Sequence, residues 1–169
     1  MRQRGSGVRG WRTPMVVGML ATMMVAAGCG GETTALRDKD GVIIRAGTVS
    51  TFDLAVGDCL QPAPTLGEDA AELDAVPCSE PHSHEVYAAE DYTESDVYPG
   101  ADALEAFADG VCFVAFEGYV GLPFDRSPLH SSHLVPTFNS WTEGEDRTVT
   151  CLLVSPEEPL TASARGRGF

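Results

Sequence analysis

Residues 102–120 read DALEAFADGVCFVAFEGYV, and this stretch decides the fold. Its apolar side chains recur every three or four residues, a spacing that places them on one face of an α-helix. They are Leu104, Phe107, Ala108, Val111, Cys112, Ala115, Phe116 and Tyr119. Pro99 and Gly100 interrupt the chain just before the stretch, and Gly118 or Gly121 is expected to end it. The sequence therefore predicts one amphipathic helix with Cys112 on its buried face.

Short β-forming runs lie on both sides of the predicted helix. They are residues 42–44, 48–54 and 86–89 before it, and residues 134–135 and 148–154 after it. Residues 61–75 mix proline, glycine and acidic side chains, so we expect a loop there. Strands, one main helix and further strands are typical of an α+β domain, here with a small antiparallel sheet.

The start of the chain has the pattern of an export signal. Four arginines and no acidic residue precede an apolar run at 15–27. A membrane-spanning helix needs about 20 apolar residues, so this shorter run indicates the hydrophobic region of a signal peptide. The run ends in Ala26-Ala27-Gly28-Cys29, which resembles a bacterial lipobox. We predict a lipoprotein signal peptide at 1–28 with Cys29 lipidated, and an ordinary cleaved signal is the alternative.

The remaining chain divides by composition. Residues 29–41 follow as the lipidated cysteine and a polar, flexible tether, and residues 42–154 form the domain. Residues 155–169 contain Pro156 and Pro159, followed by small and basic residues, so we expect a disordered C-terminal tail.

Five cysteines are present, and four remain if Cys29 carries lipid. An even number in an exported chain indicates two disulfides, and four cysteines allow three pairings. We favour Cys59–Cys78, which would close the loop at 61–75. Cys112–Cys151 would then join the predicted helix to the last strand, and the domain would be held by both bonds.

The charge of the chain is unevenly distributed. All 25 acidic residues lie after Cys29 with only 7 of the 11 basic ones, so residues 30–169 carry a net charge of −18. Such a body repels phosphate polymers, and nucleic-acid binding needs a basic surface. We therefore expect no nucleic-acid partner.

Several short motifs follow one another between residues 53 and 151. They are Asp53-Leu54-x-Val56-Gly57-Asp58-Cys59, Val76-Pro77-Cys78-x-x-Pro81-His82-x-x-Glu85-Val86, Tyr98-Pro99-Gly100, Tyr119-x-Gly121, Pro136-Thr137, Ser140-Trp141, and Asp146-Arg147-x-x-x-Cys151. By these motifs the chain resembles the septum formation family of actinobacterial envelope proteins. The resemblance implies an exported or membrane-anchored domain linked to septum formation, and it implies no known reaction. One residue departs from the pattern, because Glu145 stands between Gly144 and Asp146.

Histidine and glutamate side chains are the candidates for chemistry. His82 and His84 are weak candidates for metal ligands, with His130 and His133 as further imidazoles. Glu80 or Glu85 could act in a cell-wall hydrolase, although such pairs are expected by chance in so acidic a chain.

The interpretation we adopt is a non-catalytic binding module. The module would be lipid-anchored on the extracytoplasmic face of the cell membrane and would bind an unknown envelope or division protein without a cofactor. Its candidate interaction surface is His82, Glu85 and Trp141, if Trp141 is exposed. A metal-binding lipoprotein using His82 and His84 is the first alternative, and a hydrolase is the second.

Overall fold

The structure, a computed structural model, describes residue 1 and residues 33–62 and 71–168. The predicted signal peptide after Met1, and Cys29, lie outside the described residues. Among the helices that are described, none combines the length and the apolar character needed to cross a bilayer.

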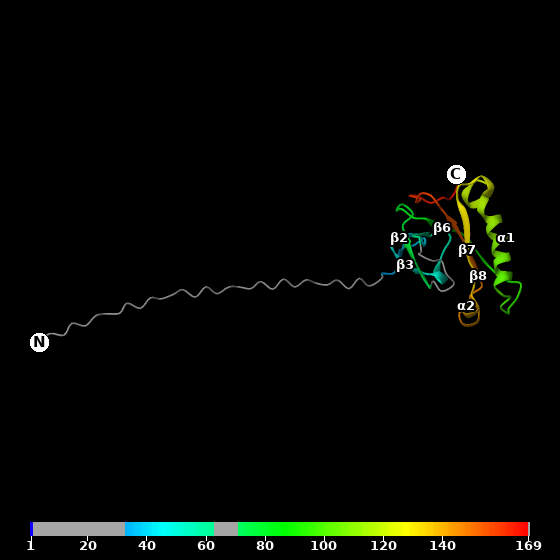
Figure 1. Cartoon of the computed structure of the whole chain (residues 1–169), viewed down its shortest axis with the longest axis horizontal. Coiled ribbons are helices and arrows are strands. Elements are labelled where there is room, and N and C mark those ends of the chain that lie inside the picture. The colour runs from blue at the N-terminus through cyan, green and yellow to red at the C-terminus, as the bar shows by residue number, and fades with distance from the viewer. Residues whose placement is uncertain (2–32, 63–70, 169) are drawn as a thin grey trace. The chain divides into compact units, whose positions relative to one another are not determined.

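Two antiparallel sheets and one main helix form the described part of the chain, which confirms the predicted α+β class (Figure 1). The larger sheet has the strand order β3-β5-β4-β6-β8-β7, and the smaller one pairs β1 with β2. The strands are β1 (Leu36–Arg37), β2 (Ile43–Arg45), β3 (Gly47–Ser50), β4 (Cys59–Leu60), β5 (Glu72–Val76), β6 (His84–Asp91), β7 (His130–Leu134) and β8 (Thr148–Val154). The helical elements are η1 (Thr51–Asp53), α1 (Ala101–Val120), η2 (Phe124–Arg126) and α2 (Phe138–Glu143).

Helix α1 is the predicted helix, and it packs along β6, β7 and β8 (Figure 1). It ends where Gly121 adopts a left-handed conformation with φ 83°, which a residue without Cβ tolerates at a helix C-terminus. Its buried side chains are Leu104, Ala108, Cys112, Phe116, Tyr119 and Val120. The structure also contains both favoured disulfides, Cys59–Cys78 and Cys112–Cys151, and the second joins α1 to β8.

The larger sheet carries an apolar core on each face. Successive residues of a strand point to opposite faces, so Cys151 and Leu153 of β8 pack under α1 while Leu152 packs on the other side. The core away from α1 contains Ile43, Val49, Leu60, Leu73, Ala75, Val86 and Leu152. Both faces of β8 are therefore buried, which agrees with its four consecutive apolar residues at 151–154.

The expected loop at 61–75 is partly a strand. Residues 72–76 form β5, which pairs with β3 on one side and with β4 on the other. Leu73 and Ala75 are buried, whereas Glu72 and Asp74 are exposed. This alternation of apolar and acidic residues is a strand pattern that the overall composition of the stretch conceals.

The C-terminal segment is folded against the domain, so the expectation of a disordered tail at 155–169 was wrong for its described residues. Leu160 forms two backbone hydrogen bonds with His82, and Ala164 is fully buried. The N–H groups of Gly166 and Gly168 donate to the carbonyls of Tyr119 and Val120 at the end of α1. These contacts satisfy carbonyls that the helix leaves without an internal partner.

Part of the expected tether at 29–41 is also folded. Leu36 and Arg37 form β1, and the Arg37 guanidinium donates to both carboxylate oxygens of Asp58, at 2.5 and 2.7 Å. Asp58 is only 3% exposed and also accepts the N–H of Ala55. The hydrogen bond to Asp58 raises the pKa of Arg37 above its ordinary value. The folded body therefore begins before residue 42.

Candidate functional site

Trp141 lies in the core, so the condition under which we predicted it to join an interaction surface, its exposure, is not met. Its side chain is 3% exposed and packs against the rings of Tyr92 and Tyr98. The indole N–H donates to the carbonyl of Asp96, and the Arg147 guanidinium stacks 3.8 Å from the ring centroid. Trp141 therefore closes the end of the domain where α1 begins, which is the structural role that buried tryptophans usually have.

The helix that carries Trp141 is held by a reciprocal cap. Thr137 accepts the N–H of Ser140 through its hydroxyl, and the Ser140 hydroxyl accepts the N–H of Thr137. The residue that departs from the family pattern, Glu145, follows α2 with a left-handed φ of 53°. Arg147 then donates to the carbonyls of Trp141 and Asp146.

Glu85 is fully buried, which also removes it from the predicted interaction surface. Its Oε1 atom accepts hydrogen bonds from the hydroxyls of Tyr119 at 2.6 Å and Ser163 at 2.5 Å. Its Oε2 atom accepts the backbone N–H of Ala164 at 2.7 Å. The donors come from α1 and from the C-terminal segment, so Glu85 joins three parts of the chain that are distant in sequence.

The environment of Tyr119 follows from this contact. Burial, and next the hydrogen bond to Glu85, raise the pKa of Tyr119 to about 12. The Arg165 guanidinium lies 4.6 Å from the centroid of the Tyr119 ring. The phenol therefore remains protonated and continues to donate to Glu85 throughout the neutral range.

His82 is also buried, at 1% exposure, so none of the three predicted surface residues lies on the surface. Its Nδ1 atom lies 2.8 Å from the carbonyl of Glu80, an acceptor, so Nδ1 carries the proton. Its Nε2 atom is buried and has no hydrogen-bond partner among the described residues. Buried polar atoms are nearly always paired, so this nitrogen requires an explanation.

Cys59, His82 and Glu85 converge on one point. A ring nitrogen of His82, the Sγ of Cys59 and a carboxylate oxygen of Glu85 all lie within 4.8 Å of one another. Cys59 on β4 pairs directly with Glu85 on β6, and directly opposed residues of neighbouring strands point to the same face. In this structure the Cys59 sulfur is bonded to Cys78.

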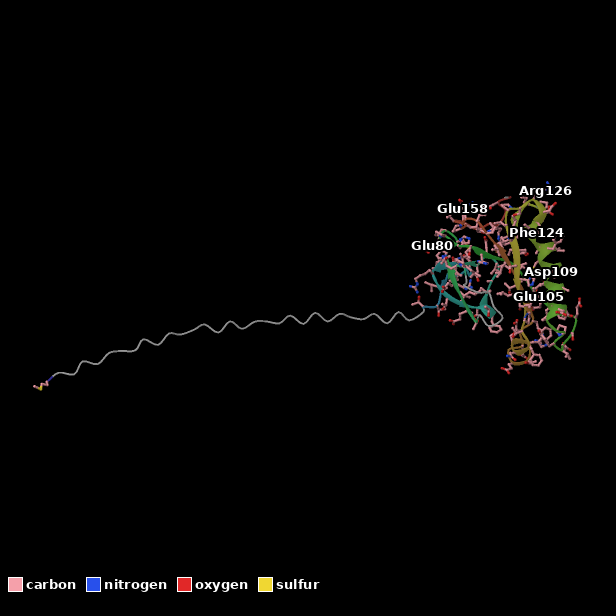
Figure 2. All side chains as sticks on the ribbon, in the orientation of Figure 1. Glu80, Glu105, Asp109, Phe124, Arg126 and Glu158 are labelled. Atoms are coloured by element: carbon pink, nitrogen blue, oxygen red, sulfur yellow. A yellow bond between two sulfur atoms is a disulfide. The ribbon has the colours of Figure 1, made fainter. Side chains whose placement is uncertain are left out.

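The other histidines lie elsewhere. His84 does not belong to the converging group, so the structure does not support the predicted pair of His82 and His84. Its Nδ1 contacts the hydroxyl of Ser83, and burial lowers the pKa of His84. His133 on β7 contacts Glu105 on α1 at 2.5 Å, and Asp109, one turn further along α1, lies 4.0 Å away. Figure 2 labels Glu105 and Asp109 on α1.

A groove of about 650 Å³ forms a second candidate site, at the surface. One side is lined by Thr51, Phe52 and Leu54, which follow the edge strand β3. The other side is lined by residues of the opposite edge strand, β7, and of α2. The sheet therefore curves enough to bring both of its edges to a single groove.

The groove combines aromatic rings with neutral and acidic polar groups. Phe52 is 61% exposed and Phe138 is 60% exposed, and the Tyr98 ring packs edge-on against Phe138. Its polar side chains belong to Thr51, Glu105, His133, Thr137, Asn139, Ser140, Asp146, Thr148 and Thr150. Among the described residues that line it, none is lysine or arginine. The groove is therefore suited to a ligand that is not anionic.

Sequence reasoning missed this groove. Phe52 lies within a stretch that we predicted to be a strand, and Phe138 lies in a short helix that we did not predict. The two residues are 86 positions apart, and only the curvature of the sheet brings them to one site.

The chain belongs to the septum formation family, because the family model described as "Septum formation" matches residues 56–166. It is similar to "Putative lipoprotein LppN" of Mycobacterium tuberculosis and to the protein of the same name of Mycobacterium bovis, each 32% identical over 123 residues. The alignment covers 71% of this chain and 67% of each relative. No solved structure matches the chain. The family match extends into the folded C-terminal segment, beyond the boundary at 154 that we predicted.

Proposed function

We propose that this protein is a lipid-anchored envelope protein whose domain binds a partner without catalysing a reaction. The proposal joins a lipobox-like sequence ending in Cys29 to a septum formation domain, and a relative of the chain is named a lipoprotein. The anchor would hold the domain at the extracytoplasmic face of the cell membrane. The partner would be a protein of the envelope or of the division machinery.

The groove supplies the observation that carries this proposal. Phe52 and Phe138 present largely exposed aromatic rings to one groove whose described lining contains no lysine or arginine. Exposed aromatic side chains in a concave site are typical anchors of protein–protein interfaces. If a partner segment covered both rings, their apolar surface would be removed from water, and this would stabilise the complex.

The charge of the protein favours one kind of partner. Residues 30–169 carry a net charge of −18, and the groove itself contains Glu105 and Asp146. Opposite charges on a partner accelerate encounter and select against anionic competitors. The proposed partner is therefore a protein segment with apolar side chains flanked by lysine or arginine.

The structure offers little support for the hydrolase alternative. A hydrolytic carboxyl group must touch the polymer that it cleaves, whereas Glu85 is fully buried and bonded to three donors. Glu80 is exposed, but glycoside hydrolysis needs two accessible carboxyl groups, and the buried Glu85 cannot be the second one.

Site-specific crosslinking tests the proposal. A photo-reactive phenylalanine analogue is placed at Phe52 or at Phe138 in the full chain, expressed in its native host, and captured proteins are identified by mass spectrometry. We expect both positions to capture the same partner. Phe113 is the matched control, because it is 67% exposed on α1 but does not line the groove.

Two results would contradict the proposal. Equal capture of the same partner from Phe113 would show that the groove is not the contact. Failure of both groove positions to capture any protein would remove the basis for a binding role. The link to division is tested separately by localising the chain with an antibody, and an even envelope signal in dividing cells would count against it.

A further inference from the structure

We propose that Cys59, Cys78, His82 and Glu85 form a zinc site that is open only when the Cys59–Cys78 disulfide is reduced. The closed disulfide and the bound metal would be two alternative states of the same four side chains. This inference is independent of the groove and of its partner. It rests on the convergence of a nitrogen, a sulfur and an oxygen ligand within 4.8 Å of one another in the buried interior.

The state of His82 is the first argument. Its Nδ1–H donates to the backbone carbonyl of Glu80, so in the neutral imidazole the lone pair lies on Nε2. Nε2 is buried and lacks a partner among the described residues. A neutral imidazole whose other nitrogen donates to a carbonyl has the tautomer and fixed orientation of a metal-ligating histidine. While the disulfide is closed, the Nε2 lone pair is buried without a partner, which is energetically costly. In the metal state the same lone pair would bind the zinc ion.

Glu85 is the second argument. Its carboxylate is buried, and none of the described ion pairs includes it. Oε2 accepts one hydrogen bond, from Ala164, and a carboxylate oxygen can accept about two. Oε2 thus keeps a free lone pair, while Tyr119 and Ser163 orient the group through Oε1. Such hydrogen-bonded carboxylates are usual among metal ligands.

The two cysteines supply the switch. A disulfide sulfur carries no thiolate, and zinc binds the thiolate. A dithiol reductant would break the S–S bond, give two thiols on Cys59 and Cys78, and itself become a cyclic disulfide. Zinc binding would then release one proton from each thiol. Exchange with an oxidised dithiol would re-form the Cys59–Cys78 bond, reduce that disulfide to two thiols, remove both sulfur ligands together and expel the metal.

The resulting ligand set suits zinc. Two thiolates, one imidazole nitrogen and one carboxylate oxygen give four ligands of the types that occur in tetrahedral zinc sites. Cys78 enters the set because its sulfur is bonded to that of Cys59 in the closed state. The Cys112–Cys151 disulfide has no such neighbours among the described residues, so it should remain indifferent to zinc.

Zinc binding to the full chain with Cys29→Ser tests the inference, since this variant has only the four cysteines of the two disulfides. The protein is treated with a phosphine reductant, incubated with zinc chloride and desalted, and its zinc content is measured. We expect one zinc ion per reduced chain and none per oxidised chain. Alkylation followed by peptide mapping should show zinc protecting Cys59 and Cys78, but neither Cys112 nor Cys151.

Substitutions then assign the ligands. Loss of groups that merely orient ligands lowers metal affinity 10- to 100-fold, so His82→Ala and Glu85→Gln should each lower zinc affinity by about tenfold or more. His84→Ala is the matched control, because His84 is a neighbouring, half-buried histidine outside the converging group. Its zinc affinity should equal that of the parent chain.

Thermal unfolding is a second measurement of zinc binding, and it is needed in case a variant or the reduced chain folds poorly. A metal that binds the folded state raises its Tm, so zinc should raise the Tm of the reduced parent chain and leave that of the oxidised chain unchanged. The inference is overturned if the reduced chain retains no zinc and shows no shift in Tm. It is equally overturned if zinc binds the His82→Ala and Glu85→Gln chains as tightly as the parent, or if it protects Cys112 and Cys151 instead.

Discussion

The hydroxyl of Tyr119 on α1 donates a hydrogen bond of 2.6 Å to Oε1 of Glu85 on β6, and both side chains are buried. Helix and sheet are thus connected by a buried polar contact in addition to their apolar packing. A hydrogen bond to a charged acceptor contributes more than one between neutral groups, and its loss leaves the acceptor under-solvated.

Tyr119→Phe should therefore lower stability in a way that depends on pH. At neutral pH we expect a loss of about 2 kcal/mol in the free energy of unfolding. The pKa of Tyr119 is raised to about 12 from an ordinary value near 10, so its contribution is complete below pH 10 and is lost as the pH rises toward 12. Urea unfolding of both chains from pH 7 to pH 11 measures the difference, which should shrink above pH 10. A difference that stays constant across this range would contradict the assignment.

Arg37→Met should destabilise the domain although Arg37 lies in the expected tether. The substitution leaves the carboxylate of Asp58, which is 3% exposed, without its cation. Removal of one partner of a buried ion pair costs about 3–5 kcal/mol. Denaturant unfolding measures the change, and Lys39→Met is the matched control, because the Lys39–Asp40 pair is largely exposed and should contribute little. Similar effects of the two substitutions would refute a structural role for Arg37.

The two disulfides should differ in their contribution to stability. The Cys112–Cys151 bond spans 39 residues and Cys59–Cys78 spans 19, and longer loops lose more entropy on closure. Replacing both cysteines of a bond by alanine should cost about 4 kcal/mol for the first and about 3 kcal/mol for the second. Unfolding in urea tests the order, and peptide mapping without reductant tests the pairing. A peptide joining Cys59 to Cys112 would overturn the connectivity.

Cys29→Ser should release the protein from membranes if Cys29 is the lipidated residue. A lipid chain contributes membrane affinity in proportion to its buried CH₂ groups, and the serine variant would lack that contribution. Fractionation of cells into membrane and supernatant, followed by immunoblotting, compares the two chains. Persistence of the variant in the membrane fraction would show that another segment provides the attachment.

The main helix and the last strand could be predicted from sequence because each has a strong local pattern. Eight apolar residues of 102–120 share one helical face, and residues 148–154 form a continuous β-forming run. Sequence alone left three disulfide pairings open, and Cys112–Cys151 was favoured because it would join these two elements. β5 was missed because glutamate and aspartate alternate with its apolar residues, so the composition indicated a loop although the period indicated a strand.

The burial of His82 and Glu85 could not be predicted, because it depends on contacts with residues that are distant in sequence. Charged residues are mostly exposed and histidine is intermediate, so no sequence rule placed Glu85 and His82 in the core. Their burial depends on Leu160, Ser163 and Ala164, in a segment whose small and basic residues indicated disorder. No local pattern in residues 155–169 identifies these partners.

The same contacts impose an order on folding. The N–H that completes the hydrogen bonding of Glu85 belongs to Ala164, 79 residues further along the chain. A chain that emerges amino-terminus first from a ribosome or an export channel must keep Glu85 hydrated until Ala164 is free, because dehydrating an unpaired carboxylate is costly. Tight packing of α1 against this part of the sheet would thus follow the release of the C-terminal segment.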